Sequence, residues 1–184
     1  MPVADAVILA AGQSRRMGRP KALLALGGVP LVVAQIRAFE AVGLRVTVVL
    51  GAHAETIAAA LPAGVRRVFN PGWEGTGPAE SAAIGLAGLG PALLTPVDVP
   101  PASAADLRAL IAASGPAVLT FGGHDGHPVR LDPPHGAGRL DERLVTAARI
   151  ASEDPDRLLN LNTPDEWAIW LRERHGLTAV GPLA

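Results

Sequence analysis

Short apolar runs alternate with longer amphipathic segments along most of this chain, and that alternation constrains the fold more than any other feature. Runs of strand length, rich in apolar and β-branched residues, occur at 6–10, 45–50, 65–69, 92–97 and 117–121. Helical patterns fill 30–42, 53–61, 79–89 and 103–113. Strands that alternate with helices are typical of α/β folds, in which helices cover a mostly parallel sheet. The sequence therefore predicts a fold of that kind.

The last third of the chain has weaker patterns. Residues 122–138 are rich in Gly, Pro and His, which indicates an extended loop or a short hairpin. The pattern favours a helix over 139–150 and a short strand over 158–161. Thr163 is predicted to cap a final helix, because Pro164 suits the first helical position and two acidic residues follow it.

Length and composition narrow the class of protein. A chain of 184 residues without an internal repeat or linker is expected to form one domain, 1–184. A net charge of −1 gives no reason to expect nucleic acid or a membrane surface as a partner. The absence of cysteine excludes disulfides and thiolate ligands, and the N-terminus lacks the basic region of a signal peptide. We therefore expect a cytoplasmic protein.

The densest chemistry follows the first expected strand, in residues 9–24, LAAGQSRRMGRPKALL. Loops at the carboxyl ends of the strands of a parallel sheet are where ligands bind. This loop combines two glycines with four cationic side chains, which are Gly12, Gly18, Arg15, Arg16, Arg19 and Lys21. Backbone N–H groups beside fixed cations suit a triphosphate. The spacing matches neither the P-loop nor the dinucleotide fingerprint, so the segment predicts a phosphate site of another kind.

Further along the chain, other positions carry candidate chemistry. Asp98 is a lone carboxylate at the end of the fourth expected strand, and Mg²⁺ typically takes one or two carboxylates and completes its shell with phosphate oxygens and water. Ser81, at the start of a helix, can contact a base or ribose, or can serve its own helix backbone. His124 and His127 lie in a Gly-rich loop without a further nearby ligand, which argues against a transition-metal pair.

The segment 9–24 closely resembles the opening signature of the MobA-like nucleotidyltransferases, especially their molybdenum cofactor cytidylyltransferase branch. The fixed positions of that signature are met by Leu9, Ala10, Ala11, Gly12, Ser14, Arg16, Met17, Gly18, Lys21, Leu23 and Leu24. Later motifs of the family are similar to 70–75 (NPGWEG), 98–100 (DVP), 126–129 (GHPV) and 160–166 (NLNTPDE). The chain departs from the family at Glu80, which replaces a serine, and between 130 and 157, where the branch's G-D-x-G-A-R stretch is not present.

The resemblance implies a three-layer, Rossmann-like fold of the nucleotide-diphospho-sugar transferase type. It implies that Lys21, Arg16 and Asp98 are catalytic, and that Asp98 holds Mg²⁺ with help from Asn160 and Asn162. His127 and Pro128 would lie beside the acceptor. The nucleotide-binding residues that it implies are Leu9, Ala10, Ala11, Gly12, Ser14, Arg16, Gly18, Lys21 and Ser81.

The implied reaction joins a nucleoside monophosphate from a triphosphate, with CTP as the leading donor, to phosphorylated molybdopterin cofactor and releases pyrophosphate. A molybdoenzyme would then be a further partner. Guanylyl transfer from GTP is the nearest alternative, because the terminal Asn-rich run looks closer to that relative, and a sugar- or polyol-phosphate acceptor is a third. A different class is a non-catalytic cofactor-binding or insertion partner. The presence of Lys21 and Asp98 argues against it, because a binding module needs no metal carboxylate.

Overall fold

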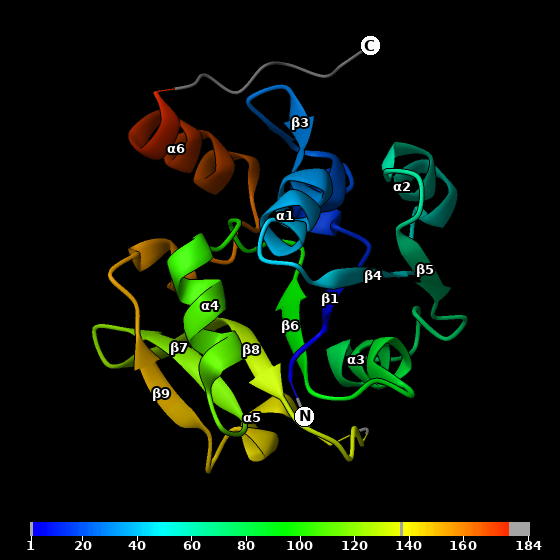
Figure 1. Cartoon of the computed structure of the whole chain (residues 1–184). Helices are drawn as coiled ribbons and strands as arrows, with labels where there is room; N and C mark the ends of the chain where they lie inside the picture. Colours follow the sequence, from blue (N-terminus) through cyan, green and yellow to red (C-terminus); the bar gives the residue numbers. More distant parts are fainter. Residues whose placement is uncertain (1, 137, 177–184) are drawn as a thin grey trace.

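The computed structural model describes residues 2–136 and 138–176 and is built around a seven-stranded sheet (Figure 1). The strands of this sheet are β1 (Asp5–Ala10), β4 (Arg45–Leu50), β5 (Arg66–Phe69), β6 (Ala92–Pro96), β7 (Ala117–Phe121), β8 (His124–Leu131) and β9 (Ala148–Ala151). A small hairpin of β2 (Ala25–Leu26) and β3 (Val29–Pro30) lies outside it. The helices are α1 (Leu31–Glu40), α2 (Ala54–Ala60), α3 (Pro78–Leu86), α4 (Ala104–Ala112), α5 (Leu140–Arg143) and α6 (Pro164–His175). Short 3₁₀ turns are η1 (Arg15–Met17), η2 (Lys21–Leu23) and η3 (Pro155–Leu158).

The sheet is mostly parallel, as the sequence predicts. Its strand order is β5-β4-β1-β6-β8-β7-β9, and β8 runs opposite to both of its neighbours, β6 and β7. The other pairs, from β5 to β6 and between β7 and β9, are parallel. Because β8 is reversed, its first residue lies opposite the last residue of β7, with His124 paired to Phe121.

Helices cover both faces of the sheet, which confirms the three-layer α/β fold (Figure 1). Side chains alternate along each strand, so Ile8 and Val48 face one layer while Val7 and Val49 face the other. The first layer is formed by α1, α2 and α4, and the second by α3 and α5. The α3 layer packs closely, because a Cβ on Gly85 would lie 2.6 Å from methyl groups of both Val7 and Val49.

A third apolar cluster lies at the end of the molecule where α6 sits. It joins α6 to the segment that follows β1, and its buried members are Met17, Leu24, Leu31, Leu161, Trp167, Trp170 and Leu171. The helix begins as the sequence predicts, since the Thr163 hydroxyl accepts from the Glu166 N–H and the Glu166 carboxylate accepts from the Thr163 N–H. None of the helices in the described part of the chain is both long enough and apolar enough to cross a membrane.

Several predictions for the last third of the chain need correction. Residues 124–131, expected in an extended loop or a short hairpin, do form a hairpin with β7, but as the eight-residue strand β8 inside the sheet. Pro128, which would break a regular ladder, falls at the register shift between β8 and β7 and just outside the paired residues of β6. The helix expected over 139–150 is only the four residues of α5, because Ala148–Ala151 instead pair with β7 as an edge strand.

The short strand expected over 158–161 is also wrong. The turn η3 ends at Leu158, and the chain then runs extended beside the end of β6. One backbone hydrogen bond joins it there, from the Leu161 N–H to the Asp98 carbonyl at 2.8 Å. A single bond does not make a strand ladder, so the segment is a support for Asp98 rather than part of the sheet. The stretch between 130 and 157, where the chain departs from the family pattern, includes Ala137, which lies outside the described residues.

Candidate nucleotide-binding site

The candidate site lies where the strand order of the sheet reverses. From β1 the chain adds β4 on one side, and later β6 on the other. In open α/β sheets the crevice at the carboxyl ends of the strands beside such a switch is where ligands bind. Here β1 runs into the signature segment at Ala11, and β6 runs into Val97 and Asp98. The N–H of Val97 donates to the Leu9 carbonyl at 3.0 Å, so the two strand ends are held together.

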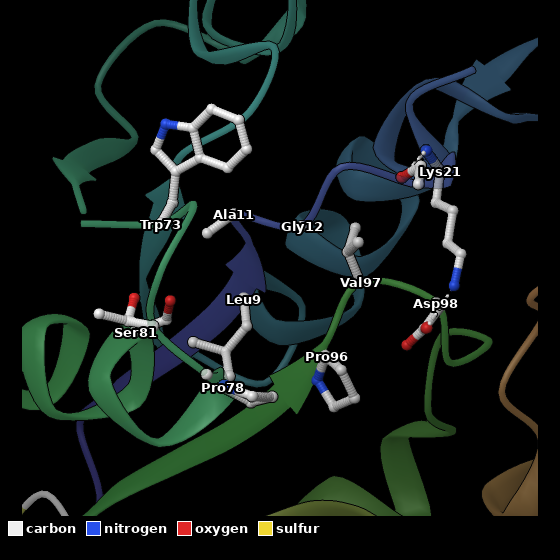
Figure 2. Close-up of a pocket in the computed structure, with 13 residues that line it drawn as sticks. Leu9, Ala11, Gly12, Lys21, Trp73, Pro78, Ser81, Pro96, Val97 and Asp98 are labelled. Carbon is white, nitrogen blue, oxygen red and sulfur yellow. Dashed lines mark hydrogen bonds and ion pairs between the residues drawn. The ribbon is translucent and has the colours of Figure 1, made fainter. Parts of the chain in front are cut away.

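A pocket of about 250 Å³ opens at this edge (Figure 2). It is lined by Leu9, Ala11, Gly12, Ser14, Lys21, Trp73, Thr76, Gly77, Pro78, Ser81, Pro96, Val97 and Asp98. Figure 2 shows Trp73, Pro78 and Ser81 toward one end, Lys21 reaching to Asp98 at the other, and Gly12 between them. The pocket is therefore mostly apolar at one end and ionic at the other.

Gly12 is a glycine that the fold itself does not require. Its φ lies outside the left-handed region, and a Cβ built on it meets no atom within 4 Å. A neighbouring glycine is different, because a Cβ on Gly51 would lie 2.6 Å from the Ala11 carbonyl oxygen and 2.7 Å from the Trp73 Cβ. Gly51 thus lets three segments meet, whereas Gly12 keeps space free inside the pocket.

The signature segment folds so that its cations are presented from a fixed turn. Ser14 and Gly18 both have left-handed φ, of 54° and 71°, and enclose η1. The Ser14 hydroxyl accepts a hydrogen bond from the Lys21 N–H at 3.1 Å, which closes the loop. Met17 is buried in the α6 cluster and anchors the turn. Arg16, the preceding residue, is exposed and lies outside the pocket lining.

Lys21 and Asp98 line the ionic end of the pocket, and Asn162 and Arg16 join them there through hydrogen bonds without being part of the lining. The Lys21 Nζ lies 2.7 Å from Asp98 Oδ2 and 2.7 Å from Asn162 Oδ1. The Arg16 guanidinium also donates to Asn162 Oδ1, at 2.9 Å. The Lys21 and Asp98 side chains are only 12% and 19% exposed, so this ion pair is much less screened than a surface pair. Asp98 and Asn162 lie 77 and 141 positions from Lys21 in the sequence, and both contact its ammonium group.

Asn162 is held in place, but Asn160 is not part of this cluster. The Glu166 carboxylate accepts from the N–H groups of Asn162 and Thr163, at 2.6 and 2.9 Å, and these bonds lower the pKa of Glu166. The Asn162 amide donates to the Asn160 carbonyl at 2.8 Å. Asn160 itself is exposed and lines a separate groove beside Trp170. A metal-binding role for Asn160 stays a prediction.

The loop 70–77 is organised by Asn70, a residue to which no sequence pattern assigned a role. Its buried side-chain amide donates to the hydroxyls of Thr76 and Ser81, at 3.1 and 3.0 Å, and its oxygen accepts from the Gly72 N–H. Ser81 therefore lines the pocket with its hydroxyl oxygen already accepting one bond. Glu80, the departure from the family pattern, turns back to the Gly77 N–H at 3.0 Å and stays out of the pocket lining.

His127 and Pro128 lie behind the Asp98 segment rather than in the lining of the pocket. Pro128 borders a small cavity together with Gln35, Pro100 and Pro101. Burial lowers the pKa of His127, while the nearby Asp98 charge acts in the opposite direction. The Nδ1 atom of His127 is buried and has no hydrogen-bond partner among residues 2–136 and 138–176. An acceptor-binding role for these two residues stays a prediction.

The ionic end of the pocket fits a hard divalent cation. One carboxylate oxygen and one amide oxygen already converge on a single positive charge, the Lys21 ammonium. Mg²⁺ accepts such oxygens and fills the remaining positions with phosphate oxygens and water. Within the described ranges no three His, Cys, Asp or Glu side chains gather as a metal cage, so a ligand phosphate would have to complete the shell.

Comparisons with known proteins show the family to which the chain belongs. The model of the MobA-like NTP transferase domain matches residues 6–155. Molybdenum cofactor guanylyltransferase of Rhodobacter capsulatus is 34% identical over 178 residues, which cover 88% of this chain and 92% of that protein. The bifunctional protein GlmU of Chromohalobacter salexigens is 37% identical over 140 residues, and this chain spans only 30% of its length.

Solved structures with the same fold include a nucleotidyl transferase from Methanothermobacter thermautotroptrophicus, with a TM-score of 0.76 and 26% identity over 90% of this chain and 94% of that one. Rv0371c from Mycobacterium tuberculosis gives a TM-score of 0.79 at 22% identity, over 93% and 98% of the two chains. The family match covers most of the chain, and the guanylyltransferase relative extends over nearly its full length. The chain therefore belongs to the MobA-like NTP transferase family and is a nucleotidyltransferase.

Proposed function

We propose that this enzyme transfers a nucleoside monophosphate from a nucleoside triphosphate to the phosphate group of molybdopterin cofactor, with Mg²⁺, and releases pyrophosphate. The observation that carries the proposal is the convergence of Lys21, Asp98, Asn162 and Arg16 at one end of a pocket whose other end is apolar. That division matches a ligand with a flat base at one end and a triphosphate at the other.

The donor would lie along the pocket with its base between Leu9 and the Trp73–Ser81 side, and its phosphates over Gly12. The absent Gly12 side chain leaves room for the ribose and the α-phosphate. Lys21 and Arg16 would then face the phosphates. Two cations fixed by the same amide oxygen lose little freedom when the charge on those phosphates grows.

The chemistry asks mainly for positioning and charge neutralisation. An oxygen of the acceptor phosphate attacks the α-phosphorus, and the bond from that phosphorus to the bridging oxygen breaks, so that pyrophosphate leaves with the electron pair. No general base is needed, because the attacking phosphate is already ionised. Lys21 and Arg16 stabilise charge on the transferring and leaving groups. Mg²⁺ held by Asp98 and Asn162, with Asn160 as a further candidate ligand, would neutralise phosphate charge when bound.

The donor base is the part of the proposal on which the two lines of support differ. The opening signature favours CTP, whereas the relative of nearly full length is a guanylyltransferase and favours GTP. Glu80 stays outside the lining, so base choice falls to the backbone of residues 9–12 and to Ser81. The molybdopterin acceptor rests on the family and on that same relative. The cytoplasmic location remains an expectation from the sequence.

Thermal melting of the purified chain with CTP, GTP, ATP, UTP and dTTP, each with and without Mg²⁺, tests the donor. A ligand at ~100 times its dissociation constant stabilises a fold by about 2.7 kcal/mol, which is easily measured. We expect a Mg²⁺-dependent shift with CTP or GTP, followed by pyrophosphate release when molybdopterin is added. Asp98→Asn should lower turnover by orders of magnitude while the chain still unfolds in one cooperative transition. A nucleotide-dependent shift without pyrophosphate release would favour the non-catalytic binding partner instead.

A further inference from the structure

The segment that carries Asp98 has few backbone donors of its own, and one of them, the Val97 N–H, already donates to the Leu9 carbonyl. Residues 96–101 read PVDVPP, and the prolines at 96, 100 and 101 have no N–H. The segment leaves the end of β6; Val97, Val99 and Pro100 are buried, and the other three residues are partly buried. Buried carbonyl groups without a hydrogen bond are costly, so donors must come from elsewhere in the chain.

Three donors from distant parts of the sequence meet this need. On one side the buried Gln35 amide donates to the carbonyls of Val99, at 2.7 Å, and Pro96, at 3.2 Å. The Leu161 N–H donates to the Asp98 carbonyl. On the other side the Arg157 guanidinium donates from Nη1 to the Pro100 carbonyl at 3.1 Å, and from Nη2 to the Pro101 carbonyl at 2.9 Å. These bonds fix the backbone on both sides of the Asp98 carboxylate.

Arg157 connects more of the site than this one segment. Its side chain is 1% exposed, and Nη1 also reaches the His127 carbonyl at 3.5 Å. A Cβ on Gly126 would overlap the Arg157 carbonyl, so the start of β8 passes directly against residue 157. Its charge is balanced by Asp154, 3.2 Å away, and by Asp106 at 4.0 Å. Four residues further along the chain, Leu161 donates to Asp98, and Asn162 follows it.

We propose that Arg157 is a positioning residue for nucleotidyl transfer, which sets the distance between the Asp98 carboxylate and the Asn162 amide oxygen. The inference rests on the proposed function. Both oxygens must meet one cation, and groups that orient metal ligands from behind matter almost as much as the ligands. A guanidinium spans several carbonyls with its planar fork, whereas a lysine ammonium is a single point and cannot bridge Pro100, Pro101 and His127 together.

Arg130 provides a matched control for the loss of a buried guanidinium. Its side chain is 5% exposed, and it donates to the backbone carbonyls of Ile111 and Ala113. It also pairs with Asp132 at 3.1 Å. None of its hydrogen bonds within the described residues reaches the Asp98 segment. Arg130→Lys therefore reproduces the structural cost of the substitution without disturbing the site.

The test compares wild type, Arg157→Lys and Arg130→Lys in three measurements: melting temperature, pyrophosphate release, and Mn²⁺ affinity in the presence of nucleotide, followed by electron paramagnetic resonance of free Mn²⁺. Both variants should melt at a lower temperature. Only Arg157→Lys should lower kcat and Mn²⁺ affinity, each by about 10- to 100-fold. Its nucleotide affinity without metal should stay within about threefold of wild type, because the nucleotide pocket does not contain Arg157.

Equal kcat and Mn²⁺ affinity in the two variants would overturn the assignment and leave Arg157 a purely structural residue. A wild-type chain that releases no pyrophosphate counts against the proposed function alone, because the Mn²⁺ affinities still separate the two variants. Should Arg157→Lys fail to fold, Gln35→Met removes the donors to Pro96 and Val99 from the opposite side of the segment. Unchanged Mn²⁺ affinity in that variant would contradict the role given to these carbonyl contacts.

Discussion

At the scale of single residues, Gly12 separates what the fold needs from what the ligand needs. Its φ lies outside the left-handed region that favours glycine, and nothing in the described structure occupies the place of its side chain. Gly85 is the opposite case, since a Cβ there would press on Val7 and Val49 at 2.6 Å. A glycine that the fold does not require, placed in the middle of a pocket, marks room reserved for a ligand.

We therefore expect Gly12→Val to fold normally and to bind nucleotide about 5- to 150-fold more weakly, since overpacking a filled site costs about 1–3 kcal/mol. Gly115→Val is the control, because Gly115 also has an ordinary φ and open space around its Cβ, and it lies outside the pocket lining. Melting curves with and without nucleotide check both variants. Normal nucleotide shifts in Gly12→Val would show that the space over Gly12 is not used.

Residues that act through motifs could be found in the sequence, and residues that act through packing could not. Lys21, Asp98 and Asn162 each stand in a recognisable run, and the structure brings them together. Gln35 and Arg157 donate to backbone carbonyls that lie far away in the sequence, and only the folded chain shows which carbonyls need a donor. Asn70 stands in the family-like run 70–75, but only the structure shows that it holds the hydroxyls of Thr76 and Ser81. The sequence did hold one signal for a residue such as Arg157, because the carbonyls of the Pro-rich segment 96–101 need hydrogen-bond donors from other parts of the chain.

At the scale of elements, the parallel half of the sheet was predictable and the reversed half was not. The run 6–10 is apolar throughout because both faces of its strand are covered, and that pattern is visible in the sequence. β8 contains Gly, His and Pro, and it becomes a strand only because β6 and β7 offer partners on both sides. β9 is four residues long, and tertiary pairing with β7 overrides its helical pattern.

The start of α6 has a pH dependence that can be tested. The pKa of Glu166 is lowered from its ordinary value of 4.5, first by the N–H of Asn162 and then by that of Thr163. A lowered pKa in the folded state means that the charged carboxylate stabilises the fold above its unfolded pKa, and that this contribution is lost as pH falls through the folded pKa. We expect the difference in unfolding free energy between wild type and Glu166→Gln to be largest at neutral pH and to shrink below pH 4.5.

Glu173→Gln is the control for that comparison, because it removes the same charge from the exposed side of the same helix. Denaturant unfolding between neutral pH and pH 3 measures both differences. The Glu173→Gln difference should show no comparable fall. A Glu166→Gln difference that stays constant down to the lowest pH would contradict the role of the two N–H groups.

At the scale of the whole molecule, the site is built on two bodies, the sheet with its covering helices and the smaller cluster around α6. Two large apolar clusters fill the faces of the sheet and include β1 and β6. The smaller α6 cluster supports Met17 and Leu161, which flank Arg16 and Asn162. Lys21 pairs with Asp98, at the end of β6, and also donates to Asn162, which follows Leu161 of the α6 cluster, so it links the sheet to that cluster. The ionic end of the pocket therefore depends on how firmly the small cluster stays docked.

Native-state hydrogen exchange should resolve these two bodies. Opening free energies rise with the number of buried contacts that an opening must break. We expect the amides of α6 to exchange together at a lower opening free energy than those of β1, β4 and β6, with a gap of about 1–3 kcal/mol. Nucleotide with Mg²⁺ should narrow that gap, because the ligand would contact both bodies. Exchange of α6 at the same free energy as the central strands would mean that the molecule opens only as one unit.

The reversed direction of β8 also determines where chains with this fold can accept an insertion near the site. The turn Gly122–Gly123, which joins β7 to β8, lies at the same edge of the sheet as Asp98, because β7 runs parallel to β6. Such a hairpin turn can lengthen without touching any crossover helix. An insertion there would project from the edge of the sheet at which the site opens. We therefore expect the length of this turn to vary among related chains with the size of the molecules that they accept.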